Sequence, residues 1–347
     1  MAKNSNKSEF TFTLPKDLLT DLKKGCKRYE PIPKVSFSPQ TSHAYDPKVA
    51  AWSINAIIAA YRQYCDKTKG STLPLDVEPD VTTLYWHEDL NILDEKIRCG
   101  YIGQIKPTEN NPKRRIVIAL RGTEKLNEWI ENLDYTQTEV SLNNAADTVT
   151  IHKGFWEILS LPATHHIPSI FENIKNAFIK LFTKKAPTPP QDTPSLLDQI
   201  YDYLSKTEYD EIYIAGHSLG AAVASLLTIE LILNIPKVEI FTYVIGCPRV
   251  GGPSLSELIR DLSENPKYNF TLWRLTNTED VVTTVPLPVI HGLTYSQLFI
   301  SKPNSPNTVG SIVFSDNLAD VGHNHDPLLY HYANEQLMPN APEDITS

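Results

Sequence analysis

The stretch EIYIAGHSLGAAVASLLTIELIL, residues 211–233, carries the pattern that decides the fold. Its first residues, EIYIA, alternate and are rich in β-branched side chains, which is typical of a strand. From Leu219 onward, a run of alanine and leucine predicts a buried helix. The turn between them holds Ser218, with Gly216 and Gly220 two residues to either side. A turn of this kind is either a nucleophile elbow, which exposes a reactive serine, or a tight turn with a capping serine.

Three further segments have the apolar, β-branched pattern of a buried strand: RRIVIALRGT (114–123), KVEIFTYVIG (237–246) and NFTLWRLTN (269–277). Helical segments separate several of these strands. In DPKVAAWSINAIIAAYRQYC, Asp46 is expected to cap a helix that begins at Pro47. Strands that alternate with helices predict an α/β fold with a central, mostly parallel sheet covered by helices on both faces.

Composition and charge exclude several classes of protein. The 347 residues are 41% hydrophobic, enough for a sizeable core, and the net charge of −9 argues against a nucleic-acid partner. No secretory signal and no apolar run of spanning length occur, so we expect a soluble, cytoplasmic protein. Four widely spaced cysteines predict neither a zinc site nor a disulfide framework and fit a reducing compartment. No metal or cofactor is expected.

The chain is expected to form one main domain with two additions. Residues 1–45 are polar and lysine-rich and are expected to form an extended N-terminal arm, with the α/β domain over 46–347. A helix is predicted within the segment at about 166–195, where apolar residues of Pro168–Lys185 fall at helical spacing before a proline-rich linker. This helix either lies on a membrane interface or packs onto the core; the sequence favours neither.

A reactive serine needs a general base, an acid that orients the base, and donors for the oxyanion. Asp280 follows the strand at 269–277 and precedes a proline-rich exit, a suitable place for the acid. Thr123, in the turn after an earlier strand, and Leu219, directly after the serine, offer backbone N–H groups to the oxyanion. The candidate bases that follow the acid are His291, His323, His325 and His331.

Six segments, taken together and in order, resemble the class 3 lipases, the family of fungal triacylglycerol lipases and their plant and bacterial relatives. They are AAWSINAIIAAY, IVIALRGTEKLNEWIENLDY, IHKGFWEI, YIAGHSLGAAVASLLTIEL, VIGCPRVGGPSLSELI and RLTNTEDVVTTVPL. The resemblance extends over about residues 46–332 and implies an α/β-hydrolase fold with a lid helix. It also implies that the helical segment at about 166–195 is an insertion, because family members have a shorter connection there.

The resemblance also implies roles for individual residues. Ser218 matches the nucleophile and Asp280 the acid, and Thr123 matches the oxyanion-hole position. The family has its base shortly before an aromatic residue near the C-terminus, which fits His325 in HDPLLY best and leaves His323 as the alternative. The implied lid is EKLNEWIENLDY, whose apolar face would line the substrate groove with Leu126, Trp129, Ile130 and Leu133.

These features predict a carboxylic ester hydrolase that acts on lipids through a Ser–Asp–His triad and an acyl-enzyme. Acylglycerols, phospholipids and galactolipids are all possible substrates, and peripheral contact with a lipid interface is expected. Two alternatives stay open: a catalytically quiet lipid-binding or scaffolding protein, and an acyltransferase or thioesterase that uses the same triad.

Overall fold

A mostly parallel sheet forms the centre of the molecule. The computed structural model describes residues 9–11, 29, 35–66, 73–87, 96–107, 112–123, 135–145, 147–161, 194–298, 300–302, 304–315 and 321–338. Within these ranges, eight strands follow the order β1-β12-β9-β8-β7-β4-β3-β2. Neighbours from β1 to β4 are parallel, whereas β2 and β3 are antiparallel additions at one edge. In that spatial order the strands are Glu9–Thr11, Thr308–Ser315, Phe270–Asn277, Glu239–Ile245, Glu211–His217, Arg115–Leu120, Lys96–Ile105 and Thr82–His87.

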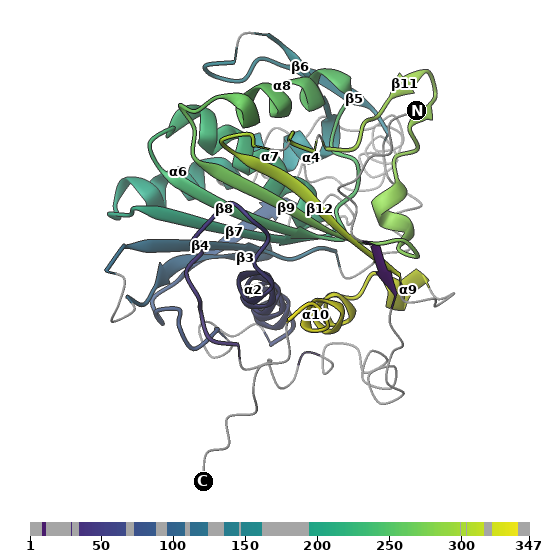
Figure 1. Cartoon of the computed structure of the whole chain (residues 1–347). Helices are drawn as coiled ribbons and strands as arrows, with labels where there is room; N and C mark the ends of the chain where they lie inside the picture. Colours follow the sequence, from purple (N-terminus) through teal and green to yellow (C-terminus); the bar gives the residue numbers. More distant parts are fainter. Residues whose placement is uncertain are drawn as a thin grey trace, which may run out of the picture.

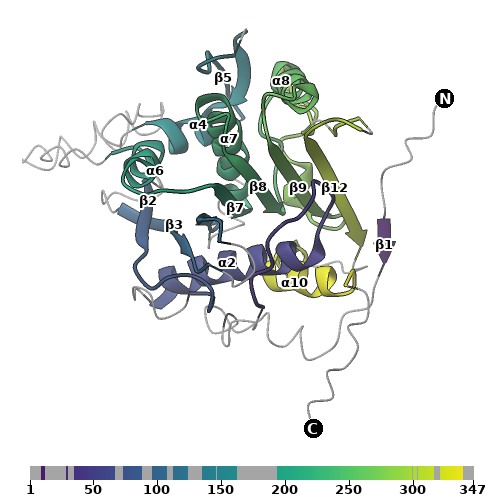
Figure 2. The same cartoon turned by 60° about the vertical axis from the view of Figure 1, so that its left-hand side comes forward.

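Helices cover both faces of this sheet (Figure 1). On one face lie α2 (Pro47–Asp66) and α10 (Pro327–Glu335), which pack against each other and bury one hydrophobic cluster. The other face carries the larger cluster, and its helices are α4 (Lys153–Ser160), α6 (Leu196–Ser205), α7 (Leu219–Asn234) and α8 (Pro253–Glu264). The turned view in Figure 2 separates these two layers and shows the sheet edge-on between them.

Smaller elements complete the described part of the chain. Two hairpins form, β5 (Gln137–Val140) with β6 (Val149–His152), and β10 (Val289–Ile290) with β11 (Leu293–Thr294). A 3-10 helix, η3 (Val281–Thr284), follows β9, and the short α9 (Val321–Asn324) precedes α10.

The predicted fold class is confirmed, and the four predicted strands and the helix expected from Pro47 lie where the sequence places them. The strands at 114–123, 211–218, 237–246 and 269–277 correspond to β4, β7, β8 and β9. Helix α2 begins at Pro47, and the Asp46 carboxylate accepts hydrogen bonds from the N–H groups of Lys48 (2.8 Å) and Val49 (3.3 Å).

One expectation about the cysteines is wrong. Cys65, at the end of α2, is disulfide-bonded, whereas Cys99 and Cys247 are free and buried. The wide spacing of the four cysteines therefore gave no indication of this bond, and it no longer supports a reducing compartment. No helix among the described residues has the length and apolar character needed to cross a membrane.

Two predicted segments fall outside the described residues. They are the lid, with Leu126, Trp129, Ile130 and Leu133, and most of the insertion at 166–195. Of the expected N-terminal arm, residues 9–11, 29 and 35–45 are described, and they lie against the domain. β1 pairs with β12 at the edge of the sheet, and the ring of Phe37 packs edge-on against Trp52 and Tyr213.

Candidate active site

Ser218 lies in a strained turn between β7 and α7. Its backbone has φ 57° and ψ −125°, a conformation that a residue with a side chain rarely adopts. The flanking glycines are required by space: a Cβ on Gly216 would lie 2.4 Å from the carbonyl oxygen of Gly220, and one on Gly220 would lie 2.3 Å from that of Arg121. The turn around Ser218 therefore has the geometry of a nucleophile elbow, in which the serine belongs neither to the regular strand nor to the regular helix.

The turn after β4 lies directly against this elbow. Strands β4 and β7 are parallel neighbours, so their carboxyl ends meet at the same edge of the sheet. A Cβ on Gly122 would lie only 2.5 Å from the Cβ of Ser218. Thr123 follows at once and is buried. The turn thus brings the peptide of Thr123 next to the serine, and Leu219 contributes an N–H from the first turn of α7, where helix N–H groups have no partner inside the helix.

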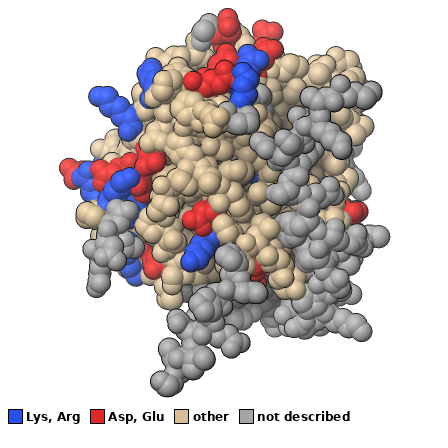
Figure 3. All heavy atoms as spheres, viewed as in Figure 1, with Lys and Arg blue, Asp and Glu red and all other residues tan. Residues whose placement is uncertain are grey.

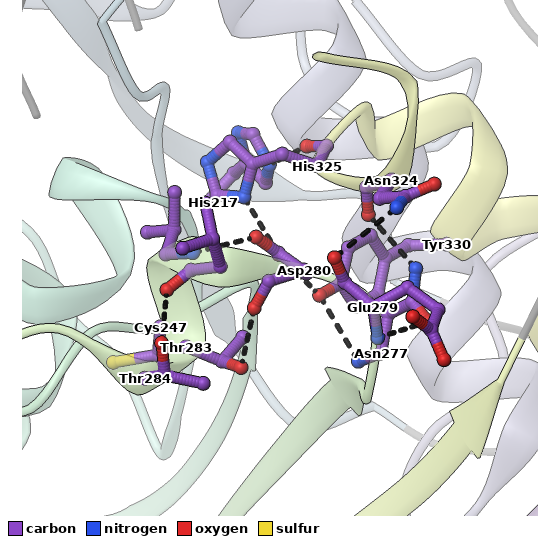
Figure 4. A network of polar contacts seen from close by, with 12 residues as sticks. His217, Cys247, Asn277, Glu279, Asp280, Thr283, Thr284, Asn324, His325 and Tyr330 are labelled. Carbon is purple, nitrogen blue, oxygen red and sulfur yellow. Dashed lines mark hydrogen bonds and ion pairs between the residues drawn. The ribbon is translucent and has the colours of Figure 1, made fainter. Parts of the chain in front are cut away.

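Asp280 occupies the loop after β9 and is fully buried. Its Oδ1 accepts the N–H of Val282 at 2.9 Å and so caps the 3-10 helix η3. Its Oδ2 accepts two hydrogen bonds, from Nδ1 of His325 and from the hydroxyl of Tyr330, both at 2.7 Å. Figure 4 shows the carboxylate between these two side chains. Three donors therefore hold an ionised carboxylate in place away from water.

The bond to Asp280 fixes which nitrogen of His325 carries the proton. A carboxylate can only accept, so Nδ1 donates, and in the neutral imidazole Nε2 keeps its lone pair. Gly246, with φ 57°, allows this pair to sit close to the sheet, because a Cβ there would lie 2.8 Å from Cε1 of His325 and 3.1 Å from Oδ2 of Asp280. The arrangement leaves His325 with the tautomer that a general base requires.

The other candidate histidines do not bond to Asp280 in the part of the chain that the structure describes. His291 is exposed in the turn between β10 and β11. His331 is buried on α10, and this burial lowers its pKa to about 4. His323, the alternative base, lies half-buried in α9. Of the two histidines His323 and His325, the one that bonds to the carboxylate of Asp280 is His325.

A second chain of hydrogen bonds links the elbow at Ser218, the turn after β4 that holds Gly122, and the loop that holds His325. Nε2 of His217 donates to the backbone carbonyl of His325 at 2.7 Å, so its Nδ1 accepts from the hydroxyl of Tyr61 at 2.6 Å. The same hydroxyl accepts the N–H of Gly122 at 2.8 Å. His217 and Tyr61 therefore join three loops that come from distant parts of the sequence.

The arrangement has the parts that nucleophilic acyl transfer needs. Ser218 Oγ and Nε2 of His325 are both buried and make no hydrogen bond to any other described residue. A substrate carbonyl beside Ser218 would meet a nucleophile, a base held by a carboxylate, and two backbone N–H groups. Among the described residues, no group of three or more histidine, cysteine or acidic side chains is arranged to hold a metal ion.

Sequence reasoning missed Tyr61 and Tyr330 as members of this site. Tyr330 stands in HDPLLY, where the spacing served only to choose the histidine. Tyr61 belongs to the apolar face of α2, whose helical pattern gives no sign that one hydroxyl reaches the sheet edge. Burial beside the Asp280 carboxylate raises the pKa of Tyr330 well above its ordinary value, so its hydroxyl stays protonated and donates.

Replacing Tyr330 with phenylalanine is expected to lower kcat for ester hydrolysis by about 3- to 10-fold, because Asp280 loses one of the three donors that hold its carboxylate and so positions His325 less firmly. Asp280 then keeps the bonds from His325 and Val282 but loses its third donor. Tyr332→Phe, on the same helix, is the matched control. An unchanged kcat in Tyr330→Phe would contradict this role.

Comparison with known proteins identifies relatives of the chain. Residues 117–290 match the model of the family Lipase (class 3). Phospholipase A1-II 3 of Oryza sativa subsp. indica is 27% identical over 212 residues, which are 57% of this chain and 44% of that protein. Phospholipase A(1) DAD1, chloroplastic, of Arabidopsis thaliana is 27% identical over 198 residues, 54% of this chain and 38% of that protein. The chain thus matches less than half the length of either relative.

Among solved structures, the native lipase propeptide complex of Rhizomucor miehei aligns with a TM-score of 0.44 at 18% sequence identity. This alignment covers 89% of this chain and 91% of the fungal chain.

Proposed function

The chain belongs to the class 3 lipase family, and from this premise we propose that it is a serine hydrolase that cleaves acyl ester bonds of lipids. The observation that carries the proposal is the buried Asp280–His325 hydrogen bond at 2.7 Å, at the sheet edge where the strained turn holds Ser218. A scaffold protein has no need of a buried carboxylate that fixes the tautomer of a histidine, so hydrolysis is the better-supported function.

The mechanism assigns one role to each residue. His325 Nε2 takes the proton of Ser218 as Oγ attacks the ester carbonyl carbon, and Asp280 stabilises the resulting imidazolium. The N–H groups of Thr123 and Leu219 stabilise the oxyanion of the tetrahedral intermediate. The intermediate collapses when the imidazolium protonates the leaving alcohol, which leaves an acyl group on the serine.

Water completes the cycle. His325 takes a proton from a water molecule that attacks the acyl carbonyl, and the second tetrahedral intermediate expels Ser218 Oγ, which recovers its proton from the imidazolium. The products are a fatty acid and the restored enzyme. These steps use side chains, two backbone N–H groups and water.

We propose a glycerolipid as the substrate and lipid aggregates as the place of action. Two relatives are named phospholipase A1, which makes a phospholipid the first substrate to test, with acylglycerols and galactolipids beside it. The loop that follows η3 exposes 53% of Leu287, and the first residue of β10, Val289, is 67% exposed, so the two offer an apolar surface suited to a lipid interface. On the face seen in Figure 3, Lys and Arg side chains lie beside Asp and Glu side chains. Among the described residues, Arg114 forms ion pairs with Glu208 and Asp210, and this mixing of charges supports the expectation that the protein has no nucleic-acid partner.

The purified chain is expected to release fatty acid from at least one of three substrates: vesicles of phosphatidylcholine, vesicles that contain a galactolipid, or an emulsion of triacylglycerol. Phosphatidylcholine labelled separately at its two acyl positions identifies which ester bond is cleaved. A fluorophosphonate should label the protein once, abolish hydrolysis, and be found by mass spectrometry on the peptide that contains Ser218. Stable binding to these vesicles without release of any fatty acid, and without labelling, would favour a scaffold protein.

A further inference from the structure

Arg121, at the end of β4, is a buried cation whose role the proposed mechanism does not include. Its side chain has no exposed surface. The guanidinium lies over the ring of Tyr64, with 3.8 Å from Cζ to the ring centroid, and 5.6 Å from that of Trp86. Nε donates to the backbone carbonyl of Arg98 at 2.8 Å, and one terminal nitrogen donates to the carbonyl of Gly122.

Burying a guanidinium in this environment has a high cost in desolvation free energy. Within the described residues, the structure gives Arg121 no carboxylate partner, and its second terminal nitrogen has no hydrogen bond. Two carbonyls and two aromatic faces compensate only part of the desolvation of a full charge. An apolar side chain of similar volume would cost less there, so the position calls for an explanation other than stability.

The carbonyl of Gly122 provides that explanation, because it belongs to the same peptide unit as the N–H of Thr123. A trans peptide is planar, and its C=O and N–H point in opposite directions. When Arg121 holds the carbonyl on its own side, the N–H of Thr123 must point to the other side. If the Gly122–Thr123 peptide were rotated by half a turn, the carbonyl oxygen of Gly122 would occupy the position where the N–H of Thr123 is needed as a donor to the oxyanion.

The sequence leaves this peptide free to turn unless something holds it. Gly122 must be glycine, because a Cβ there would lie 2.5 Å from the Cβ of Ser218 and 2.6 Å from the hydroxyl of Tyr61. Glycine has the widest choice of backbone conformations, so its own side imposes no orientation on the peptide that follows. The preceding peptide is held by the bond from Gly122 N–H to the hydroxyl of Tyr61, and the carbonyl of the following peptide accepts a hydrogen bond from Arg121.

We propose that Arg121 is a positioning residue that holds the Gly122–Thr123 peptide with its N–H available to the oxyanion. The proposal rests on the proposed function, in which Thr123 is an oxyanion donor. The aromatic rings of Tyr64 and Trp86 fix the plane of the guanidinium, and the bond to Arg98 fixes its position along β3. A lysine cannot replace it, since one ammonium does not span both carbonyls.

The test is the Arg121→Lys variant with two reversible inhibitors. Loss of one oxyanion donor lowers kcat by about 10²- to 10³-fold in hydrolases, so kcat for a soluble p-nitrophenyl ester should fall about 100-fold with KM changed less than about 3-fold. An alkyl boronic acid, which forms a tetrahedral adduct with the serine, should bind about 100-fold more weakly. An alkyl ether analogue of the ester, which forms no oxyanion, should bind as it does to the wild type.

Arg98→Lys is the matched control, since the Arg98 side chain donates to the Gln63 carbonyl at 3.4 Å in the same region and does not touch Gly122. Tyr64→Leu is a milder variant that removes an aromatic face and keeps the charge. It should lower kcat and boronic acid affinity together by a few-fold. If Arg121→Lys does not fold and Tyr64→Leu leaves boronic acid affinity unchanged, the role of Arg121 is structural and the proposal is overturned.

Equal weakening of the boronic acid and the ether in Arg121→Lys would also overturn it. A crystal structure of Arg121→Lys gives a readout that does not depend on turnover: the Gly122 carbonyl should be turned away from residue 121, and an unchanged peptide contradicts the proposal. A wild type that hydrolyses no ester and binds no boronic acid would instead remove the proposed function, and the crystal structure would still decide the orientation.

Discussion

Replacing Ser218 with alanine is expected to lower kcat for ester hydrolysis by about 10⁴- to 10⁶-fold, the loss that follows removal of the nucleophile in other serine hydrolases. The hydroxyl is the only atom removed, and no other described residue bonds to it, so no buried group loses its partner. Alanine must adopt the same strained φ of 57° that serine already adopts. The thermal midpoint should therefore stay close to that of the wild type while activity is lost.

The measurement needs a control for the loss of a buried hydroxyl. Ser225→Ala serves, because Ser225 is buried on the same helix and its hydroxyl donates to the carbonyl of Ala221 at 2.8 Å. It should keep kcat within about 2-fold. Undiminished hydrolysis by Ser218→Ala, measured on the same ester and after the same purification, would contradict the mechanism. Fluorophosphonate labelling should vanish in Ser218→Ala and persist in Ser225→Ala.

The sequence predicted the centre of the sheet because each central strand is a continuous apolar run that ends at a recognisable turn. The elbow was readable for the same reason: two glycines around a serine have a steric meaning that the close approaches at Gly216 and Gly220 bear out. The strands β2, β3 and β12 were not predicted. Glycines interrupt the apolar pattern of β3 and β12, and β12 pairs with β9 and β1, which are not its neighbours along the chain.

The site was predictable only in part, because its residues meet through tertiary contacts. Asp280 was inferred from its place after a strand, but the choice between two histidines that stand two residues apart needed the end of α9 and the start of α10. The contributions of Tyr61 from α2 and Tyr330 from α10 depend on how these helices cross the sheet edge. No single segment contains that information.

Replacing His325 with alanine is expected to lower kcat by about 10⁴- to 10⁶-fold, whereas His323→Ala should change it less than about 3-fold. Without the imidazole, nothing removes the proton of Ser218, although Asp280 keeps the hydrogen bonds from Tyr330 and Val282. The two variants remove the same ring from neighbouring positions, so each controls for the other. The comparison is made with kcat for one soluble ester and with the rate of fluorophosphonate labelling.

The double variant Ser218→Ala, His325→Ala then separates a coupled pair from two independent defects. If His325 acts only by activating Ser218, its removal from a protein without the serine has nothing further to abolish, and the double variant should retain the same residual rate as either single variant. If the two losses multiply, the residues act separately and His325 is not the base of Ser218. A larger loss of kcat in His323→Ala than in His325→Ala would identify His323 as the base, and the Asp280–His325 bond would then be structural.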